Sequence, residues 1–401
     1  MVDYDPFSDA ILDDPFPIYK RLRDESPVHW LEPYKAWALS RFEDVWQVGQ
    51  QPEIFAAGSA GLDLLDPDLA YSRQMQVEEG RSNVNSMNPP DHTLLRARIA
   101  PHFTPRRVAR LESEIRKTVI ECLDRTLPTG RCDVIGDLAG KVSVRVASLL
   151  IGLPLEDGDF LSGLVNRFFL REPGTRGMPP DAMVAMGEMR EYLLNAARER
   201  RKRGPGDEDL LDALLVAEVG GRPFNDEEVA SQASVLVVGG TETLPKVFAG
   251  GILQLFAHPD QRARLAADPS LQNDAFTEIL RMEMPTQFLG RVVARDVEFG
   301  GQKLKTGHKV LLLFRSANRD DREFVAPDRF DIDRCPPRIL SFGHGTHVCL
   351  GQHAARLEAR VMYEELLARV PEYHVDASQV VPARSEFVAG YLSVPIAFDP
   401  V

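Results

Sequence analysis

One cysteine lies within an unusually glycine-rich stretch near the end of the chain. The segment 341–351 has the sequence SFGHGTHVCLG and places Cys349 close to Gly343, Gly345 and Gly351. Glycine permits positive φ angles and a close approach of the backbone to another group. The stretch therefore predicts a tight loop pressed against a flat partner, with a single thiol beneath that partner.

Cys349 also opens a helical pattern, in which Leu350, Ala354, Leu357 and Val361 share one face. A helix N-terminus with free N–H groups favours an anionic sulfur, and the thiolate is the form that binds metals. A heme with a cysteine axial ligand would match a flat partner above one sulfur. The alternative for a lone cysteine is a buried small apolar side chain.

The run from Phe342 to Gly351 closely resembles the heme-binding motif of the cytochrome P450 family, and CLGQHAARLEAR continues it in the style of soluble bacterial members. The resemblance implies that Cys349 is the metal ligand of heme b, that Phe342 packs near the thiolate, and that His347 meets a heme propionate. It also implies a mainly α fold with small β-sheets, in which the heme lies between a long distal helix and the cysteine loop.

Two further segments resemble the family's contacts to the heme propionates. NPPDHTLLR, residues 88–96, places His92 and Arg96 four positions apart and hence on one helical face. Arginine can bind a carboxylate through two hydrogen bonds, and a pair of propionates needs such donors. Arg291 occupies the position that reaches a propionate in relatives. The alternatives are a surface His–Arg pair and a solvated arginine at a strand end.

Glu278 and Arg281 match the family's ExxR pattern, which alone is weak because residues 78–81 match it by accident. The resemblance adds PDRF at 327–330, whose Arg329 is expected to join them in a buried ionic cluster. The cluster would be structural and would lock the layer behind the heme loop, because breaking a buried pair leaves one charge without a partner.

The segment 237–247, VVGGTETLPKV, has features that favour a kinked helix. Gly239 and Gly240 remove side chains from the face that would cross the heme. Pro245 cannot donate a helix hydrogen bond, so the carbonyl of Thr241 should lose its usual partner.

The same segment resembles the family's oxygen-binding helix, with Glu242 and Thr243 as an acid–alcohol pair. Thr243 could donate a hydrogen bond to dioxygen, and Glu242 could relay protons from solvent. The alternatives are a threonine bonded to its own i−4 carbonyl and a solvated glutamate. Leu244 and Pro245 depart from many relatives, which have a second hydroxyl residue and no proline there.

The rest of the sequence predicts the elements that position these residues. Helices are expected at 15–26, through most of 91–203, at 225–258 with Asn225 and Glu228 as a capping box, at 273–284 and after Cys349. Strands are expected at 27–40 as a hairpin with Trp30 and Trp37, at 291–314 and at 373–400. The stretch 55–88 should be loop-rich and 198–209 a solvated loop. No repeat or long linker divides residues 1–401, which predicts a single domain.

Composition limits the classes of partner. The 401 residues carry 47 basic and 60 acidic side chains, a net charge of 47 − 60 = −13, which argues against nucleic acid. Four cysteines without CxxC spacing favour a reducing, cytoplasmic compartment. We find neither a signal peptide nor an apolar run of roughly 18–20 residues, so no membrane segment is expected.

The substrate pocket is the least determined part, because the resemblance is weakest at 55–86 and 160–205. Candidate lining residues are Phe168, Phe169, Leu236, Gly239, Phe288, Leu289, Val388 and Tyr391. Each can equally be an ordinary core residue. Their character implies an apolar substrate, and a terpenoid, an aromatic compound, a steroid and a polyketide all remain open.

The resemblance implies a monooxygenase that uses dioxygen to hydroxylate, O-dealkylate or epoxidise a hydrophobic small molecule. No flavin or iron–sulfur motif is present in the sequence, so electrons should come from a ferredoxin and its ferredoxin reductase. That partner would dock on the cysteine side, at a basic patch of Arg106, Arg107, Arg356 and Arg360. Two alternatives are a peroxide-driven peroxygenase, against which Glu242 and Thr243 argue, and a non-catalytic heme- or ligand-binding protein of the same fold.

Overall fold

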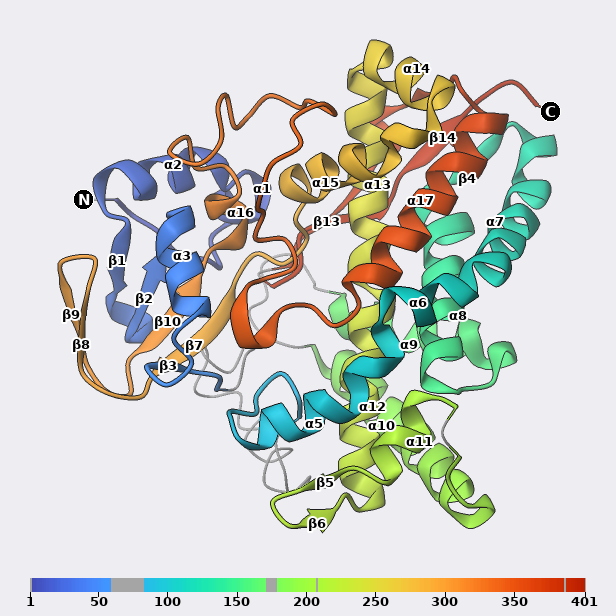
Figure 1. Cartoon of the computed structure of the whole chain (residues 1–401). Coiled ribbons are helices and arrows are strands. Elements are labelled where there is room, and N and C mark those ends of the chain that lie inside the picture. Colours follow the sequence, from blue (N-terminus) through green and yellow to red (C-terminus); the bar gives the residue numbers. More distant parts are fainter. Residues whose placement is uncertain (1, 59–82, 171–178, 207, 386, 401) are drawn as a thin grey trace.

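A β-rich region and a larger helical region make up the structure, a computed structural model that describes residues 2–58, 83–170, 179–206, 208–385 and 387–400 (Figure 1). The N-terminal strands and the segment 289–312 form the β-rich region, and helices from the middle and the end of the chain form the helical one. The glycine-rich loop 341–351 lies between them. The predicted mainly α fold with small sheets is confirmed.

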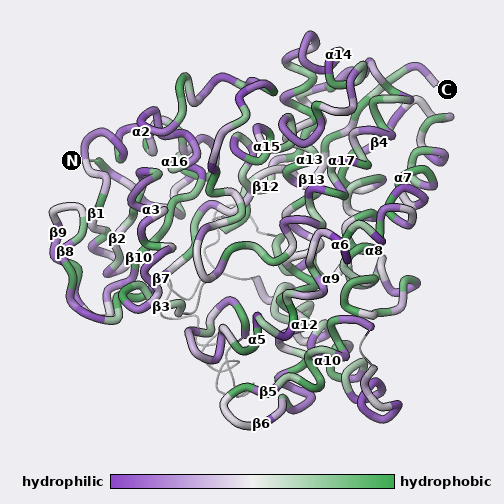
Figure 2. The backbone as a smooth tube through the Cα atoms, viewed as in Figure 1, coloured by the Kyte–Doolittle hydropathy of each residue, from purple (hydrophilic) through white to green (hydrophobic). Residues whose placement is uncertain are grey.

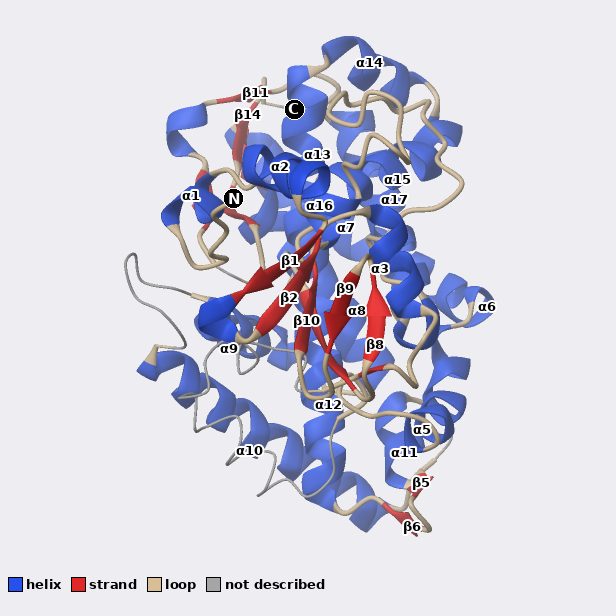
Figure 3. Cartoon of the chain, turned by 90° about the vertical axis from the view of Figure 1, so that its left-hand side faces the viewer, coloured by secondary structure: helices blue, strands red, loops and turns tan. Residues whose placement is uncertain are grey.

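The principal sheet has five strands in the order β1-β2-β10-β7-β3. Figure 3 shows β1, β2 and β10 side by side. The strands are β1 Val28–Leu31, β2 Ala36–Leu39, β3 Phe55–Ala56, β7 Leu289–Val293 and β10 Lys309–Leu312. The predicted hairpin at 27–40 is confirmed, since β1 and β2 pair antiparallel with Trp30 opposite Trp37. Side chains alternate between the two faces of the sheet. Trp37 and Val310 pack toward α3, whereas Ala38 and Leu311 pack toward α2.

Four smaller sheets complete the β structure. A three-stranded sheet contains β4 Arg131–Asp133, β11 His374–Val375 and β14 Pro395–Ala397. Three two-stranded sheets pair β5 Glu218–Val219 with β6 Arg222–Pro223, β8 Val297–Phe299 with β9 Gln302–Leu304, and β12 Val381–Ala383 with β13 Gly390–Ser393. The strands expected at 291–314 and 373–400 are thus present, while most of the loop-rich stretch 55–88 lies outside the described residues.

Helices account for most of the remaining chain. The first half holds α1 Asp9–Asp13, α2 Phe16–Glu25, α3 Phe42–Gly49, α5 Asp91–Ile99, α6 Pro105–Val108, α7 Glu112–Thr126, α8 Gly140–Ile151, α9 Gly158–Phe169, α10 Pro180–Arg203 and α11 Leu210–Leu215. The second half holds α12 Asp226–Thr241, α13 Thr243–Ala257, α14 Pro259–Ala267, α15 Gln272–Met282, α16 Phe314–Ala317 and α17 Gln352–Arg369. In the described part of the chain, none of these helices combines the length and apolarity that crossing a bilayer requires.

The prediction of a loop over 198–209 is wrong in its first half. Helix α10 continues through the charged run RERRKR to Arg203 and stops at Gly204, whose φ of +84° suits glycine. Arginine, lysine and glutamate all have good helix propensity, so charge alone does not end a helix. The charged run forms the polar end of a helix that packs on α12.

The long helix expected at 225–258 is divided at Glu242 into α12 and α13. Its capping box is confirmed: the Glu228 N–H donates to Asn225 Oδ1 across 2.8 Å, and the Asn225 N–H donates back to Glu228 across 2.9 Å. The break falls three residues before Pro245, as the missing N–H of proline predicts. Because of this break, Thr243 is the first residue of a new helix rather than part of a continuous one.

The core lies where α8, α13 and α17 meet, and Figure 2 shows hydrophilic residues on the outer turns of α7, α10 and α14. One contact there needs a glycine. The Tyr363 hydroxyl of α17 donates to the Phe248 carbonyl of α13 across 3.1 Å. A Cβ on Gly251 would lie only 2.0 Å from the hydroxyl oxygen of Tyr363. This close packing fixes α17, and with it the cysteine loop that precedes α17, against the distal helix pair.

Candidate active site

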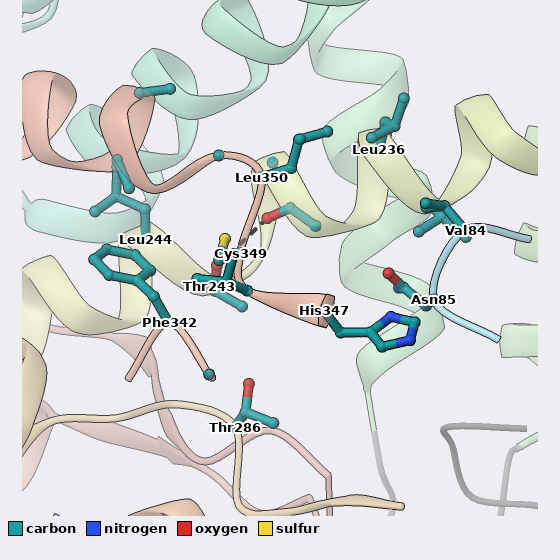
Figure 4. A pocket seen from close by; sticks show the side chains of 18 of the residues that line it. Val84, Asn85, Leu236, Thr243, Leu244, Thr286, Phe342, His347, Cys349 and Leu350 are labelled. Carbon is teal, nitrogen blue, oxygen red and sulfur yellow. Dashed lines mark hydrogen bonds between the residues drawn. The ribbon is translucent and has the colours of Figure 1, made fainter. Parts of the chain in front are cut away.

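A cavity of about 560 Å³ lies between the helix pair α12–α13 and the loop before α17 (Figure 4). Its walls come from segments far apart in the sequence, namely 83–86, 284–291 and 341–351 together with helices α5, α8, α12 and α13. The predicted residues Cys349, Thr243, Phe342, His92, Arg96, Arg291 and His347 all line it. The fold therefore brings together in one site side chains that the sequence placed on four separate motifs.

Cys349 presents its sulfur to this cavity. Its N–H donates to the Phe342 carbonyl across 2.8 Å, which closes the loop, and its exposed surface opens into the cavity. Burial raises the pKa of the Cys349 thiol, while the N–H groups of Gly351 and Gln352 lower it. The N–H groups at the helix terminus thus lower the pKa of the thiol, as predicted, but desolvation raises this pKa by more. A bound cation would stabilise the thiolate.

The loop is anchored by α3 from the N-terminal region. A Cβ on Gly345, which has a φ of +73°, would lie 1.8 Å from the Gly49 carbonyl oxygen at the end of α3. Trp46 of the same helix stacks on His344, with ring centroids 3.4 Å apart and planes 15° apart. Gly345 is therefore required because the loop packs against the protein backbone at Gly49. The sequence analysis had instead attributed this glycine to close approach of a flat partner.

Four basic side chains gather at one end of the cavity. The His92 and His347 rings approach to 4.2 Å between centroids, and Arg96 Nη2 donates to the Val348 carbonyl across 2.8 Å. Both ring nitrogens of His92 and Nε2 of His347 are buried without a hydrogen-bond partner among the described residues. Arg291 is buried and donates to the carbonyl of Gly290.

Burial and mutual repulsion lower the pKa values of these groups. Burial, followed by the charges of Arg96 and Arg291, lowers the pKa of His92 to about 4. Burial, followed by Arg291, His92 and Arg96, lowers the pKa of His347 to about 3. Burial also lowers the pKa of Arg291 to about 10. An anionic ligand at this end of the cavity would reverse these shifts and supply the missing acceptors.

The ionic cluster behind the loop is present, but its third member differs from the prediction. Glu278 and Arg281 are fully buried and joined by two hydrogen bonds of 2.7 and 2.8 Å. Arg334, not Arg329, completes the cluster through a 3.0 Å bond from Nε to Glu278. Arg329 is 70% exposed and pairs with Asp331, because the turn at 327–330 directs its side chain outward.

Thr243 lines the cavity with a weakly engaged hydroxyl. Its Oγ1 lies 3.4 Å from the Gly239 carbonyl, long for a hydroxyl donor, whereas Thr241 Oγ1 donates to the Val237 carbonyl across 2.8 Å. The alternative interpretation of Thr243, a helix threonine bonded to its i−4 carbonyl, is therefore only weakly realised. The Thr243 hydroxyl can turn toward a polar group in the cavity.

Glu242 is neither a solvated residue nor part of the cavity lining. Its side chain is 4% exposed and forms an ion pair with Lys246, which is 6% exposed. The alternative of a solvated glutamate is wrong, because the carboxylate is paired with a lysine inside the protein. The sequence contained the signal, since positions i and i+4 of a helix are neighbours.

Half of the candidate pocket residues reach the cavity. Phe168, Leu236, Gly239 and Leu289 line it, whereas Phe169, Phe288, Val388 and Tyr391 pack into apolar clusters beside it. Phe169, Phe288 and Val388 each lie one position away from a lining residue, and a one-residue step reverses the side chain in a strand. Tyr391 lies on β13, four positions beyond the lining residue Phe387. The cavity also contains Asn85, Thr286 and Phe387, which no pattern in the sequence distinguished.

Glu358 is a further lining residue that the sequence analysis missed. It lies on α17 and accepts a hydrogen bond from the Ser143 hydroxyl of α8 across 3.0 Å. Burial raises the pKa of Glu358 to about 8, although the hydrogen bond from Ser143 lowers it. A carboxylic acid that stays protonated at neutral pH therefore forms part of the wall near α17.

Glu358→Gln should make the protein more stable near pH 8 and leave stability unchanged near about pH 4.3, the ordinary pKa of glutamate. Between that value and the folded pKa of about 8, the folded state holds a proton that the unfolded state has lost. Stability therefore falls as pH rises through this window, by at most about 1.4 kcal/mol per pH unit. Unfolding midpoints measured across the window test this, with exposed Glu372→Gln as control. Parallel curves for all three proteins would contradict it.

The predicted basic patch is only partly available. Arg360 pairs with Glu112 and Glu364 at 2.7 and 2.9 Å, and Arg356 donates to Thr277 and lies over the Phe342 ring. Arg107 donates to the backbone carbonyl of residue 208, and Arg106 is exposed. The charge of the patch is thus concentrated at α6 rather than along α17.

Comparison with known proteins gives consistent similarities. The family model described as Cytochrome P450 matches residues 269–370. Cytochrome P450 130 of Mycobacterium tuberculosis is 35% identical over 394 residues, 95% of this chain and 94% of that protein. Vitamin D(3) 25-hydroxylase of Pseudonocardia autotrophica is 34% identical over 412 residues, 99% of this chain and 97% of that protein. The crystal structure of CYP109E1 from Bacillus megaterium in complex with testosterone matches with a TM-score of 0.85 at 29% identity, covering 97% and 98% of the two chains.

Proposed function

Because the chain belongs to the cytochrome P450 family of monooxygenases, we propose that it oxidises an apolar small molecule with dioxygen and electrons from a ferredoxin. The observation that carries this proposal is the placement of Cys349 and Thr243 on the wall of one cavity. A thiol and a loosely held hydroxyl on one apolar cavity provide a metal ligand and a proton donor at the same site.

The cofactor is heme b, and the residues present fit it. Its two carboxylates would be the anionic partners that His92, His347, Arg96 and Arg291 do not find among the described residues. Cys349 would hold the iron through its sulfur. When bound, the heme supplies an iron centre at which dioxygen is activated, and a cysteine ligand favours cleavage of the O–O bond.

The chain's own part in the chemistry is to manage protons and water. Thr243 holds a proton on Oγ1 at the cavity wall and can pass it inward, because its bond to the Gly239 carbonyl is long. Leu244, Val247 and Leu236 exclude water around it. We propose that Glu242, the neighbouring acid, replaces the proton that Thr243 gives up.

The substrate should be largely apolar with at least one polar group. Leu236, Phe168 and Phe387 offer an apolar surface, and Asn85 and Thr286 add hydrogen-bonding groups. One relative is named a vitamin D(3) hydroxylase, another a steroid monooxygenase, and one structural neighbour was solved with testosterone. We propose steroid-like compounds as the first class to test, by the shift that a bound substrate causes in the heme absorption.

The electron donor and the cellular location are part of the same proposal. A small ferredoxin with its reductase would dock on the cysteine side, near the exposed Arg106 on α6, which packs on α17. A cytoplasmic location is supported by the four cysteines, all of which are free thiols. Electrostatic docking at this surface would weaken as salt concentration rises.

Thr243→Ala should lower product formation by about 10²-fold, the lower end of the effect of a positioned proton donor. Consumption of reducing equivalents should continue, because electron supply does not depend on the hydroxyl, and peroxide should accumulate in place of product. The measurement follows reductant, product and peroxide during turnover of a substrate chosen by the absorption shift.

Thr241→Ala is the matched control for that experiment. It removes the same hydroxyl two residues away, from a buried side chain bonded to the Val237 carbonyl outside the cavity lining. Product yield should stay close to that of the natural protein. Equal yields from both variants would reject the role of Thr243, and no product from the natural protein with any substrate would reject the proposed oxidation.

A further inference from the structure

A buried glutamine on α12 holds a short segment of the cavity wall. Gln232 is 1% exposed, and its Oε1 accepts a hydrogen bond from the Val84 N–H across 2.8 Å. The two residues are 148 positions apart in the chain. A side-chain amide inside a protein is unfavourable unless it is hydrogen-bonded. Gln232 is therefore a specific tie between α12 and the segment 83–86, rather than part of the apolar packing around it.

The segment is also fixed by its own packing. Val84 and Met87 are 6% and 5% exposed and belong to the same apolar cluster as Ala233 of α12. The Met87 N–H donates to the Asn83 carbonyl across 3.0 Å, which closes a turn between these two residues. Apolar side chains of the segment thus pack into the core, and the residue between them is directed elsewhere.

That residue is Asn85, which lines the cavity. Figure 4 shows its side-chain amide extending from the segment toward the interior of the cavity. The Asn85 backbone N–H donates to Asn83 Oδ1 across 3.1 Å, whereas its side-chain amide makes no hydrogen bond to any described residue. A fixed backbone therefore presents an amide whose donors and acceptor are available to a bound molecule.

The chemistry of the amide favours a neutral oxygen as its partner. Asparagine offers two N–H donors and one acceptor, which suit a hydroxyl or carbonyl oxygen. A carboxylate would be held better by the basic side chains of the cavity. Leu236 lies one turn after Gln232 on α12 and lines the cavity, as does Thr243 beyond it. A molecule that bonds Asn85 can thus extend its carbon skeleton along Leu236 toward Thr243.

We propose that Gln232 is a positioning residue that fixes the segment 83–86, so that the Asn85 amide binds a hydroxyl or carbonyl oxygen of the substrate. The inference rests on the proposed function of this site and names the contact that orients the substrate. Gln232 is not among the described lining residues, so it acts through Val84. Without this tie the Val84 N–H loses its acceptor, and Asn85 is no longer held toward the cavity.

Matched ketones and hydrocarbons test the role of Asn85 through the shift that they cause in the heme absorption. The pairs are androstanone with androstane and menthone with menthane. Asn85→Leu should weaken the binding of the tighter ketone by about tenfold, because the ketone oxygen loses its hydrogen bond. Binding of the parent hydrocarbon should stay the same or become slightly tighter, since it offers no oxygen to the amide.

Gln232→Leu should reproduce this loss for the ketone, and adding Asn85→Leu to it should weaken binding little further. Such non-additivity shows that the two residues act through one contact. Gln232→Glu should restore the affinity, because a glutamate that burial keeps protonated retains a carbonyl oxygen at the same reach. Amide hydrogen exchange at Val84 should be faster in Gln232→Leu and close to that of the natural protein in Gln232→Glu.

Two variants serve as controls. Thr286 also lines the cavity with a hydroxyl, but its backbone pairs with Val388, so the effect of Thr286→Val should add to that of Gln232→Leu. Gln272→Leu makes the same substitution at a glutamine that is 2% exposed and outside the cavity lining, and it should change neither affinity nor exchange. If Gln232→Leu does not fold, Gln232→Asn withdraws the acceptor by one methylene and should show the same coupling.

Three results would overturn the inference. These are equal weakening of ketone and hydrocarbon by Asn85→Leu, additive losses from Gln232→Leu and Asn85→Leu, and binding of neither ketone by the natural protein. A merely structural Gln232 would weaken both members of a pair. Failure of the proposed function has a different appearance: the ketone binds through Asn85, but the reduced protein forms no product from it or from any other compound with dioxygen.

Discussion

Cys349→Ser should abolish both product formation and the thiolate-type absorption that the reduced protein shows with carbon monoxide. Cys349 supplies the one thiol among the described residues that line the cavity. A serine hydroxyl does not ionise near neutral pH and is a far weaker electron donor than a thiolate. The measurement is the absorption spectrum of the reduced protein under carbon monoxide, with heme content determined on the same sample.

Cys335→Ser provides the control for this experiment. It makes the same substitution at an exposed cysteine that does not line the cavity, so spectrum and product yield should be unchanged. Heme content separates loss of the ligand from loss of the cofactor, because the four basic side chains that line the cavity remain. A thiolate-type spectrum in Cys349→Ser would refute Cys349 as the ligand.

The second large effect is expected from Arg334→Ala, which should lower the free energy of unfolding by about 3 kcal/mol. The substitution removes a cation whose side chain is only 11% exposed from the fully buried Glu278, and it leaves the backbone carbonyls of Ala326 and Arg329 without the donor that Arg334 provides. Arg281 and the Asp331 N–H still donate to Glu278, so the carboxylate keeps these two partners. Denaturant-induced unfolding of the heme-loaded protein measures the difference.

Arg329→Ala is the matched comparison, because family resemblance assigned Arg329 the role that Arg334 has in the structure. Its exposed pair with Asp331 should contribute less than about 1 kcal/mol. If Arg329→Ala proves the more destabilising of the two, the arrangement of the ionic cluster given by the structure is wrong. Both variants should keep the absorption spectrum of the natural protein.

The sequence predicted those helices and strands well that depend on short patterns of neighbouring residues. The capping box at Asn225 and the hairpin at Trp30 and Trp37 depend on a few neighbouring residues, and both are present. The predicted loop over 198–209 differs from the structure because the charged run stays helical to Arg203 and α10 stops at Gly204. The high helix propensity of arginine, lysine and glutamate keeps such a segment helical, and the low helix propensity of glycine ends it.

The motifs in the sequence predicted those site residues whose side chains all face one cavity. Cys349, Thr243, His92 and Arg291 converge on one cavity because each motif specifies a side chain that faces it. The sequence could not distinguish Arg334 from Arg329, since they lie in successive turns of one loop and only packing decides which side chain points inward. Half of the predicted pocket residues do not line the cavity for the same reason, because only packing decides which side chains face it.

The contact between α3 and the cysteine loop also sets an order of events in biosynthesis. Gly49 and Gly345 touch across 345 − 49 = 296 positions of the chain. At a synthesis rate of about 5–20 residues per second, α3 leaves the ribosome ~15–60 seconds before the loop that it anchors. The face of α3 around Trp46 must stay uncovered during that interval. Heme capture can begin only when nearly the whole chain has been made, so interrupted synthesis should release chains that contain α3 but no site for the cofactor.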